Sequence, residues 1–520
     1  MPELSFADIA RRDFCVHIVD LTAEDWREQL FANLDPPFVK DNPGDASFQN
    51  LLCLAKQELK ACTAVIEPYI STDWNDEYAA LYSRIFQKVP RITRRIHFFS
   101  AKVRYQDLYK LGKPLVEAYL GYSVVRPLSS FRVGDTVLRS PCTVGGIGKD
   151  LVHCRAQFDV SLLGSRLQVS GMPFLQQETS VAVCAGADLW MVARYLNKKG
   201  ETRRYQPAEI TQLATRTITI GPARAGLFDL QMMDALRQMG LNPVILHAMH
   251  SREAKEFMYT CVESELPVIV GMPGHVVVAI GHDYESKTKF DAFTGTTGTM
   301  SDAVASFIIH DDAKGPYEKV AVGKTYKQLP DGRELEVLTL DDRPVNFFLV
   351  ALPPRIHMHW HDVWRHTSIS IEGINNYAAA CMNMEGEEFW RREALDNLVA
   401  RVYLRLSSDF KHDLLNQEAG QTLRNTTAVA KYKCMHMPKY VWVVELANRS
   451  ELQSVSAYER KIRGEILLDS TGNRHIPDET LMALNLNGVM FIPRCGETPA
   501  EVIVADDLPY SPLQRSTRER

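Results

Sequence analysis

The stretch Met172–Leu196, MPFLQQETSVAVCAGADLWMVARYL, decides the fold expected for this chain. It predicts an extended segment, a polar turn and then a helix that begins at Cys184, because small and apolar residues recur at helical spacing from Ala185 onward. The helix is expected to end in Asn197–Gly200, which is a stop signal. Cys184 therefore falls on the first turn, where unpaired N–H groups and the helix dipole favour a thiolate over a thiol.

A second stretch, Pro267–Asp283 (PVIVGMPGHVVVAIGHD), contains a histidine that can act as a base. Two β-branched runs, Val268–Val270 and Val276–Ile280, flank a Gly-Met-Pro-Gly turn, and this pattern predicts two adjacent strands. His275 stands at the start of the second strand.

A third stretch, Ser306–Tyr317 (SFIIHDDAKGPY), predicts a short strand that ends in Asp311 and Asp312. Upstream of the cysteine, Gln176 and Gln177 carry amide groups that can donate a hydrogen bond to an oxyanion. Glutamine, cysteine, histidine and acid in this chain order are the functional groups of a papain-like thiol hydrolase.

These segments, together with Gly226–Leu246 (GLFDLQMMDALRQMGLNPVIL), resemble the compact papain-like peptidases typified by bacteriocin-processing leader peptidases. The resemblance covers only the central part of the chain. It implies an α+β fold in which a helix bearing the cysteine packs on an antiparallel sheet bearing the histidine, with further N- and C-terminal domains. It also implies Cys184 as nucleophile, His275 as base, Asp311 as orienting acid and Gln177 as oxyanion donor.

The sequence departs from the family pattern around the cysteine. Cys-Ala-Gly-Ala stands where the family has Cys-Gly-Pro-Ala, and Gln177 lies seven residues before Cys184 instead of six. The acid also has an alternative, because Asp291 in KFDAFTG follows the histidine strand as well. Asp311 is preferred, since Phe307–His310 is the better strand and a turn follows it.

The expected function is that of a cysteine peptidase, which cleaves a peptide or isopeptide bond of a protein or peptide substrate without a cofactor. Two alternatives stay open from the residues. One is a catalytically inactive papain-like module that holds a peptide without cutting it. The other is a transglutaminase-like acyl transferase, which keeps the thiol and changes the acceptor.

The chain of 520 residues is longer than one hydrophobic core usually organises, so several domains are expected. The hydrophobic periodicity and the turn residues predict a helical N-terminal region at 1–120 and a strand-rich region at 121–165 that packs on the core. The papain-like domain is expected at 166–330, and a mixed α/β domain of unknown role at 331–520. Within the last region, Glu387–Ser407 and Lys411–Arg424 have helical texture.

Composition excludes some function classes. The formal net charge of -5 argues against nucleic acid as the main partner. The N-terminus has no signal-peptide core and no apolar run reaches about 18 residues, so neither secretion nor a membrane segment is expected and the chain is predicted to be cytoplasmic. Ten cysteines without a CxxC pair indicate reduced thiols. The oligomeric state is not indicated.

One further pattern is IHMHWHDVWRH, in which His357, His359 and His361 alternate. On a strand these imidazoles would project from one face and could hold a transition metal. Trp360 and Trp364 favour a packed aromatic cluster instead, so no metal is expected here.

Overall fold

The computed structural model describes residues 7, 9–34, 45–86, 88–141, 151–177, 184–216, 227–247, 249–285, 289–294, 297–329, 332–381, 398–416, 426–452, 462–472, 480–486, 489–493 and 501–504. For Cys184 and Ala185 it describes the backbone but not the side chains. Helices and mostly antiparallel sheets are mixed along the chain, in agreement with the expected α+β composition.

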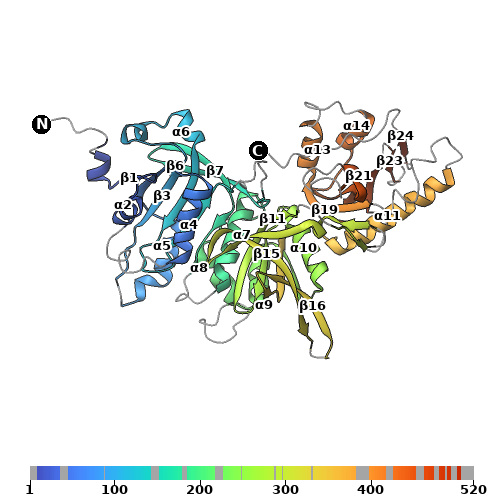
Figure 1. The fold of residues 1–520 in the computed structure, drawn as a ribbon, viewed down its shortest axis with the longest axis horizontal. Helices are drawn as coiled ribbons and strands as arrows, with labels where there is room; N and C mark the ends of the chain where they lie inside the picture. The colour runs from blue at the N-terminus through green and yellow to red at the C-terminus, as the bar shows by residue number, and fades with distance from the viewer. Residues whose placement is uncertain are drawn as a thin grey trace.

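Three large sheets follow one another across the molecule, from the N-terminal to the C-terminal part (Figure 1). The first has six strands in the described part of the chain, in the order β1-β2-β3-β4-β5-β8. Its strands are β1 (His17–Asp20), β2 (Thr63–Tyr69), β3 (Thr93–Phe99), β4 (Tyr119–Val125), β5 (Val133–Leu138) and β8 (Pro173–Phe174), and its helices are α2 (Trp26–Ala32), α4 (Ala46–Cys53), α5 (Thr72–Ala80) and α6 (Lys113–Glu117). A separate hairpin, β6 (Ala156–Leu162) and β7 (Ser165–Gly171), packs beside it.

The central sheet has the order β17-β16-β15-β14-β11-β10-β18-β9. These strands are β9 (Asn242–His247), β10 (Val268–Met272), β11 (His275–Tyr284), β14 (Val304–Asp311), β15 (Gly315–Gln328), β16 (Glu334–Leu340), β17 (Arg343–Pro344) and β18 (Phe347–Leu352). The helices around it are α7 (Cys184–Lys198), α8 (Pro207–Arg216), α9 (Asp229–Gln238) and α10 (Ser251–Glu263).

The third sheet has the order β12-β13-β19-β20-β21-β22-β23-β24. Its strands are β12 (Ala292–Thr294), β13 (Thr297–Thr299), β19 (Leu398–Leu406), β20 (Tyr440–Asn448), β21 (Ile462–Asp469), β22 (Leu481–Leu486), β23 (Val489–Ile492) and β24 (Glu501–Val504). The helices of this part are α11 (Trp360–Cys381), α13 (Ser407–Asn416), α14 (Thr426–Cys434) and α15 (Arg449–Leu452).

The central sheet is covered on both faces. In β10, Ile269 faces a core shared with α7 and the first sheet, whereas Val268 and Val270 face a second core shared with α10 and the third sheet. Successive side chains of a strand point to opposite faces, so a continuous apolar run is what a strand buried on both faces requires. The molecule is therefore layered, with α7 and α9 on one face of the central sheet and α10 on the other.

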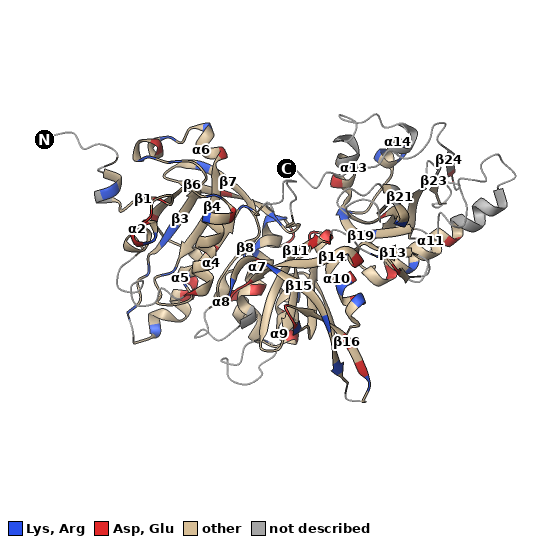
Figure 2. Ribbon diagram, in the orientation of Figure 1, with Lys and Arg blue, Asp and Glu red and all other residues tan. Residues whose placement is uncertain are grey.

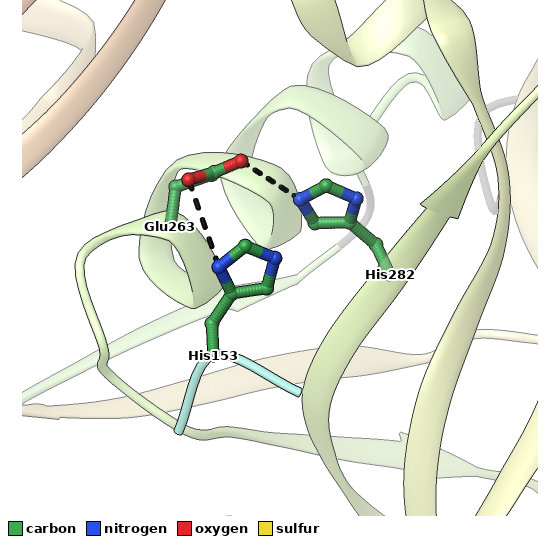
Figure 3. A group of neighbouring side chains, drawn as sticks. All are labelled: His153, Glu263 and His282. Carbon is green, nitrogen blue, oxygen red and sulfur yellow. Dashed lines mark hydrogen bonds and ion pairs between the residues drawn. The ribbon is translucent and has the colours of Figure 1, made fainter. Parts of the chain in front are cut away.

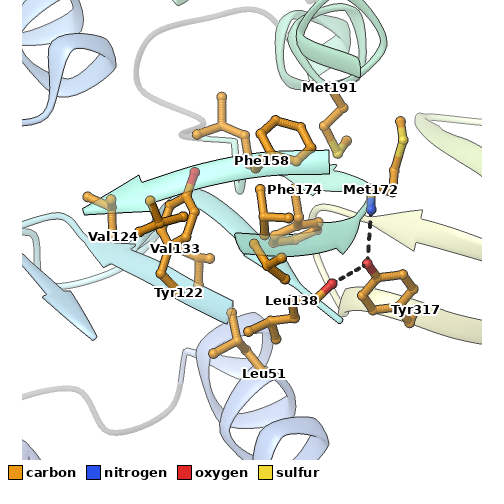
Figure 4. Close-up of a cluster of buried hydrophobic side chains, with 14 of the residues drawn as sticks. Leu51, Tyr122, Val124, Val133, Leu138, Phe158, Met172, Phe174, Met191 and Tyr317 are labelled. Atoms are coloured by element: carbon orange, nitrogen blue, oxygen red, sulfur yellow. Dashed lines mark hydrogen bonds between the residues drawn. The ribbon is translucent and has the colours of Figure 1, made fainter. Parts of the chain in front are cut away.

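The first sheet and the central sheet share one core (Figure 4). Tyr317 of β15 links them, because its hydroxyl donates to the carbonyl oxygen of Leu138 at 2.8 Å and accepts from the N–H of Met172 at 3.1 Å. Phe174 of β8 and Met191 of α7 pack in the same cluster. The segment that leads to Cys184 is thus fixed between the two sheets.

The observed elements differ from the expected regions at three places. In the described part of 1–120 the strands β1, β2 and β3 form half of a sheet, and β4 and β5 of the expected region 121–165 continue that same sheet. The expected boundary at 330 falls between the end of β15 and the start of β16, and the central sheet runs on to Leu352. The division of the chain into independently folding units stays a prediction.

A helix was expected at Glu387–Ser407, and this expectation is wrong for its second half. Residues 398–406 form β19, which pairs with β20 along its whole length. The sequence LVARVYLRL offers apolar residues at nearly every position, so helical spacing alone does not distinguish a helix from a strand buried on both faces.

No helix of the described residues is long and apolar enough to cross a membrane. Basic and acidic residues are mixed along the ribbon (Figure 2), as the totals of 59 Lys and Arg against 64 Asp and Glu lead one to expect.

Gly281 allows a distant segment to cross β11 at close range. Val152 bridges to Gly281, and the N–H groups of His153 and Cys154 both donate to the carbonyl oxygen of Ile280 at 3.0 Å. A Cβ atom at position 281 would lie 2.1 Å from the carbonyl oxygen of Leu151. The absence of a side chain here is therefore a packing requirement.

We expect Gly281→Ala to destabilise the protein, because the crossing segment has to move away from β11. A cost of about 2–3 kcal/mol, within the usual range for single substitutions, should lower Tm by a few °C, since the shift is about 2–4 °C per kcal/mol for domains of roughly 150–250 residues and smaller for larger units. Thermal melting followed by circular dichroism measures this. Gly373→Ala is the control, since it adds a methyl group in open space on α11 and should leave Tm unchanged or slightly raised. Similar melting temperatures for the two variants would contradict the packing requirement.

Candidate functional site

His275 is placed by a tight hairpin. Met272 pairs with His275 across β10 and β11, so Pro273 and Gly274 form the turn. Gly274 has a φ of 69°, in the left-handed region that favours glycine. The imidazole consequently stands at the very start of β11, at the edge of the buried sheet, and it is partly exposed.

Asp311 is the last residue of β14, the antiparallel neighbour of β11. Because Val278 faces His310 in this register, the start of β11 and the end of β14 lie at the same edge of the sheet. His275 Nε2 lies 2.8 Å from Asp311 Oδ1. The structure thus brings these two predicted residues into direct contact.

The carboxylate of Asp311 is well satisfied. Its Oδ1 atom also accepts from the backbone N–H groups of Ala313 at 2.9 Å and Lys314 at 3.3 Å. Burial alone would raise the pKa of Asp311, but the bond and charge of His275 and these two N–H groups hold that pKa below its usual value. With Nε2–H donated to this anion, Nδ1 is the imidazole nitrogen left to accept a proton.

A second acid, Asp312, stands on the other side of the imidazole. Its Oδ1 atom lies 3.8 Å from His275 Nδ1. Burial, together with the neighbouring charge of Asp311, raises the pKa of Asp312 to about 6, although His275 opposes the shift. The two ring nitrogens of His275 are therefore flanked by two different carboxyl groups.

Helix α7 brings a third acid to the same place. Asp188 is fully buried, and neither of its carboxyl oxygens has a hydrogen-bond partner among the described residues. Burial, followed by the charges of Asp312 and Asp311, raises the pKa of Asp188 well above its usual value. The mutual effect of these charges shows that the face of α7 that carries Asp188 is turned toward the end of β14.

The cysteine lies one turn from Asp188. Helix α7 begins at Cys184 and packs against β11. Residues four apart on a helix lie on the same face, so Cys184 and Asp188 share one face of α7. The side chain of Cys184 lies outside the described part of the structure.

The two glutamines have different surroundings. Gln176 is used structurally, because its Oε1 atom accepts from the N–H of Val133 at 3.1 Å and its Nε2 atom donates to Asp45 at 2.9 Å. The side-chain oxygen of Gln177 is buried and has no hydrogen-bond partner among the described residues. Residues 178–183, which connect Gln177 to Cys184, lie outside the described residues, so its role as oxyanion donor stays a prediction.

The remaining candidates lie elsewhere. Asp291 is exposed and precedes β12 of the third sheet, and its carbonyl oxygen accepts from Arg252. His357 and His359 are in the loop before α11 and His361 is in its first turn, so the strand considered for them is not formed. Their exposed side chains make no group with metal-ligand spacing among the described residues.

Sequence reasoning missed the contributions of Asp188 and Asp312 to this site. A signal existed for Asp188, because this acid shares its helix face with Ala185, Met191 and Val192 and so interrupts an otherwise apolar face. A buried carboxyl group without a partner is costly, so such an interruption marks a site where the surrounding residues compensate the charge or the group stays protonated.

Two groups of described side chains have the spacing of metal ligands, with ligand atoms within 4.8 Å of one another. The first consists of His275, Asp311 and Asp312, and the second of His153, Glu263 and His282. In the first group His275 is hydrogen-bonded directly to Asp311, which is the arrangement of an imidazole oriented by an acid.

Comparison with known proteins adds little. No protein-family model matches the chain, and no curated protein matches it. The crystal structure of UfSP from C. elegans matches 35% of this chain and 34% of its own, with 14% sequence identity and a TM-score of 0.22. The match thus spans about a third of that protein, and a similarity this weak does not establish a common fold. The resemblance to bacteriocin-processing peptidases therefore stays a prediction.

The raised pKa of Asp312 predicts a pH-dependent stability. Between about pH 4 and pH 6 the folded chain holds a proton on Asp312 that the unfolded chain has lost, so the free energy of unfolding falls as pH rises through this window. Asp312→Asn removes the cost of ionisation and should stabilise the protein by about 1–2 kcal/mol at pH 7, with no gain at pH 4. Tm measured against pH for this variant and for the exposed control Asp342→Asn tests it. A gain that is the same at both pH values would contradict the assignment.

Proposed function

We propose that this chain is a papain-like cysteine hydrolase that cleaves a peptide or isopeptide bond. Cys184 is the nucleophile, His275 the general base and Asp311 the acid that orients the imidazole. The observation that carries the proposal is the 2.8 Å contact between His275 Nε2 and Asp311 Oδ1 at the edge of the sheet on which α7 packs.

The geometry of the histidine supports this role. An orienting acid has to fix the imidazole tautomer and leave the opposite nitrogen available to the nucleophile. Asp311 meets the first condition, because it accepts from Nε2 and is held as an anion by two backbone N–H groups. Nδ1 is then the atom that accepts the proton of the thiol.

The position of the cysteine supports the role of nucleophile. Cys184 occupies the first position of α7, where the helix dipole stabilises a thiolate. The charges of Asp312 and Asp311 help burial to raise the pKa of Asp188, one turn further, and the proposal has Cys184 on this same face of the helix, toward His275. The raised pKa favours the neutral form of Asp188, and this limits the negative charge beside the thiolate.

In the proposed reaction, the proton of the Cys184 thiol passes to His275 Nδ1 and the thiolate attacks the carbonyl carbon of the scissile amide. The backbone N–H of Cys184 and the amide of Gln177 are the proposed donors to the oxyanion. Collapse of the tetrahedral intermediate breaks the C–N bond, and the leaving amine takes the proton from the imidazolium. Water, deprotonated by His275, then hydrolyses the thioester and restores the thiol.

A second candidate function is favoured by Asp312. Its Oδ1 atom lies 3.8 Å from His275 Nδ1, the nitrogen that should receive the thiol proton. An ionised carboxylate at this position competes with the thiol for contact with Nδ1. In that case the domain would hold a peptide without cutting it.

An acyl transferase would use the same thiol and differs only in the acceptor, so the incorporation of an amine into a glutamine substrate distinguishes it from a hydrolase.

Labelling of the thiol tests the nucleophile. Low concentrations of iodoacetamide should modify Cys184 first, and Cys184→Ala should abolish this fast phase in peptide mapping by mass spectrometry. Cys154→Ala and Cys261→Ala are matched controls, because both of these thiols are buried and burial raises the pKa of Cys261. They should leave the fast phase intact. Equal labelling of all three variants would exclude Cys184 as an activated nucleophile.

The rate of Cys184 labelling also tests the base and the acid. His275→Ala should slow the reaction at pH 7 by about 10–30-fold, because a thiol with an ordinary pKa of about 8.5 is only about 3% thiolate at this pH. Asp311→Asn should slow it as well, because the amide no longer holds the imidazole as an anion does. Asp291→Asn is the control and should have no effect. If Asp291→Asn slowed the reaction and Asp311→Asn did not, the orienting acid would be Asp291 and the assignment of Asp311 would be wrong.

A further inference from the structure

Three side chains from distant parts of the chain meet away from the candidate active site (Figure 3). His153 comes from the segment that crosses β11, Glu263 is the last residue of α10, and His282 belongs to β11. Two imidazoles and a carboxylate are the donor set that binds zinc in many proteins. Residue spacing gave no indication of this group.

The donor atoms already converge. His282 Nε2 lies 2.9 Å from Glu263 Oε1, and His153 Nδ1 lies 3.8 Å from Glu263 Oε2. The two imidazole rings are stacked, with centroids 4.6 Å apart and planes inclined by 19°. Tetrahedral zinc with bonds of about 2.0–2.1 Å places its ligand atoms roughly 3.3–3.4 Å apart, so each pair of donor atoms, now 4.8 Å apart or closer, has to change its separation by about 1.5 Å at most. The two stacked rings also have to tilt, because an imidazole binds a metal along the nitrogen lone pair in the plane of its ring.

The chain holds these residues firmly. Glu263 and His282 are almost completely buried, and His153 is mostly buried. The crossing segment is fixed to β11 by three backbone hydrogen bonds of 3.0 Å, two to the carbonyl oxygen of Ile280 and one from His282 to Leu151. His153 and His282 are thereby held on adjacent backbones, which is the preorganisation that a metal site needs.

The charges around these three residues are also compatible with a bound cation. Arg401 of β19 is the guanidinium that contacts Glu263, and it is shared with Glu445 at 2.8 Å. This guanidinium therefore contacts two buried carboxyl groups, and buried carboxylates are stabilised by paired cations or by bound metal.

We propose that His153 Nδ1, His282 Nε2 and Glu263 form a binding site for one zinc ion that ties the crossing segment to α10 and β11. Both hydrogen bonds that Arg401 donates to Glu263 go to Oε2, so Arg401 orients the carboxylate from that side. Oε1, which lies 2.9 Å from His282 Nε2 and accepts from the Tyr284 hydroxyl at 3.3 Å, is the oxygen proposed to bind the ion. The site is structural, since it lies in the core between the central and third sheets. It does not depend on the proposed hydrolase activity.

The experiment measures zinc in the full chain with Cys184→Ala as the parent, because this variant removes the candidate nucleophile as a thiolate ligand. The chelator-treated protein is titrated with Zn²⁺ against a competing fluorescent chelator, and with Co²⁺ followed by its visible absorption. We expect one equivalent of zinc and a rise in Tm on binding. His153→Gln and His282→Gln should each weaken zinc binding by at least about 100-fold and remove the rise in Tm.

Two controls separate this site from other metal-binding groups. Asp311→Asn disrupts the group around His275, and His359→Ala removes one of the exposed histidines before α11; both should still bind one equivalent. His153 is less buried than His282, so His153→Gln decides the matter if His282→Gln does not fold. Binding of less than 0.1 equivalent, on the order of trace contamination, or unchanged affinity in His153→Gln would overturn the proposal. So would loss of the zinc in Asp311→Asn.

Discussion

The burial of the central sheet on both faces is the constraint on which the rest of the structure depends. Because β10 and β11 present apolar side chains to a core on either side, polar groups of these strands fit only at the strand ends or where another polar group meets them. His275 takes the first solution, at the edge of the sheet beside Asp311. His282 takes the second, inside the layer against Glu263. The two polar groups thus arise from one packing requirement.

Local patterns were sufficient to predict the parts of the candidate site that local structure builds. The hairpin around Pro273 and Gly274, the start of α7 at Cys184 and the end of β14 at Asp311 all follow from turn residues and apolar runs. The contact between His275 and Asp311 could be anticipated, since adjacent antiparallel strands place the start of one beside the end of the other. Nothing local indicated Asp312 as a neighbour of Nδ1.

What the sequence could not provide is the pairing of distant segments. Helical spacing did not reveal β19, because a strand buried on both faces is apolar at most positions and lacks regular alternation. The expected boundary at 330 split the β15–β16 hairpin, because the charged residues of these two strands change the character of the sequence although their pairing continues the central sheet. His153 reaches His282 only because Gly281 admits the crossing segment, and a contact of that kind leaves no periodic signal.

Electrostatics decides how the candidate site can work. The repulsion between a carboxylate and a thiolate about 5 Å apart is roughly 3 kcal/mol at an effective dielectric constant of about 20. This is more than the stabilisation of about 0.3–1 kcal/mol that a helix dipole gives to the thiolate. Under the proposed function, a thiolate at Cys184 is therefore compatible with Asp188, one turn away on the helix, only if this acid is protonated or turned away. Burial acts in this direction, because it raises the pKa of Asp188 and that of Asp312 while His275 and two N–H groups keep that of Asp311 low. The three acids are thus unequal: Asp311 is held as an anion, Asp312 loses its proton near pH 6, and burial favours the neutral form of Asp188.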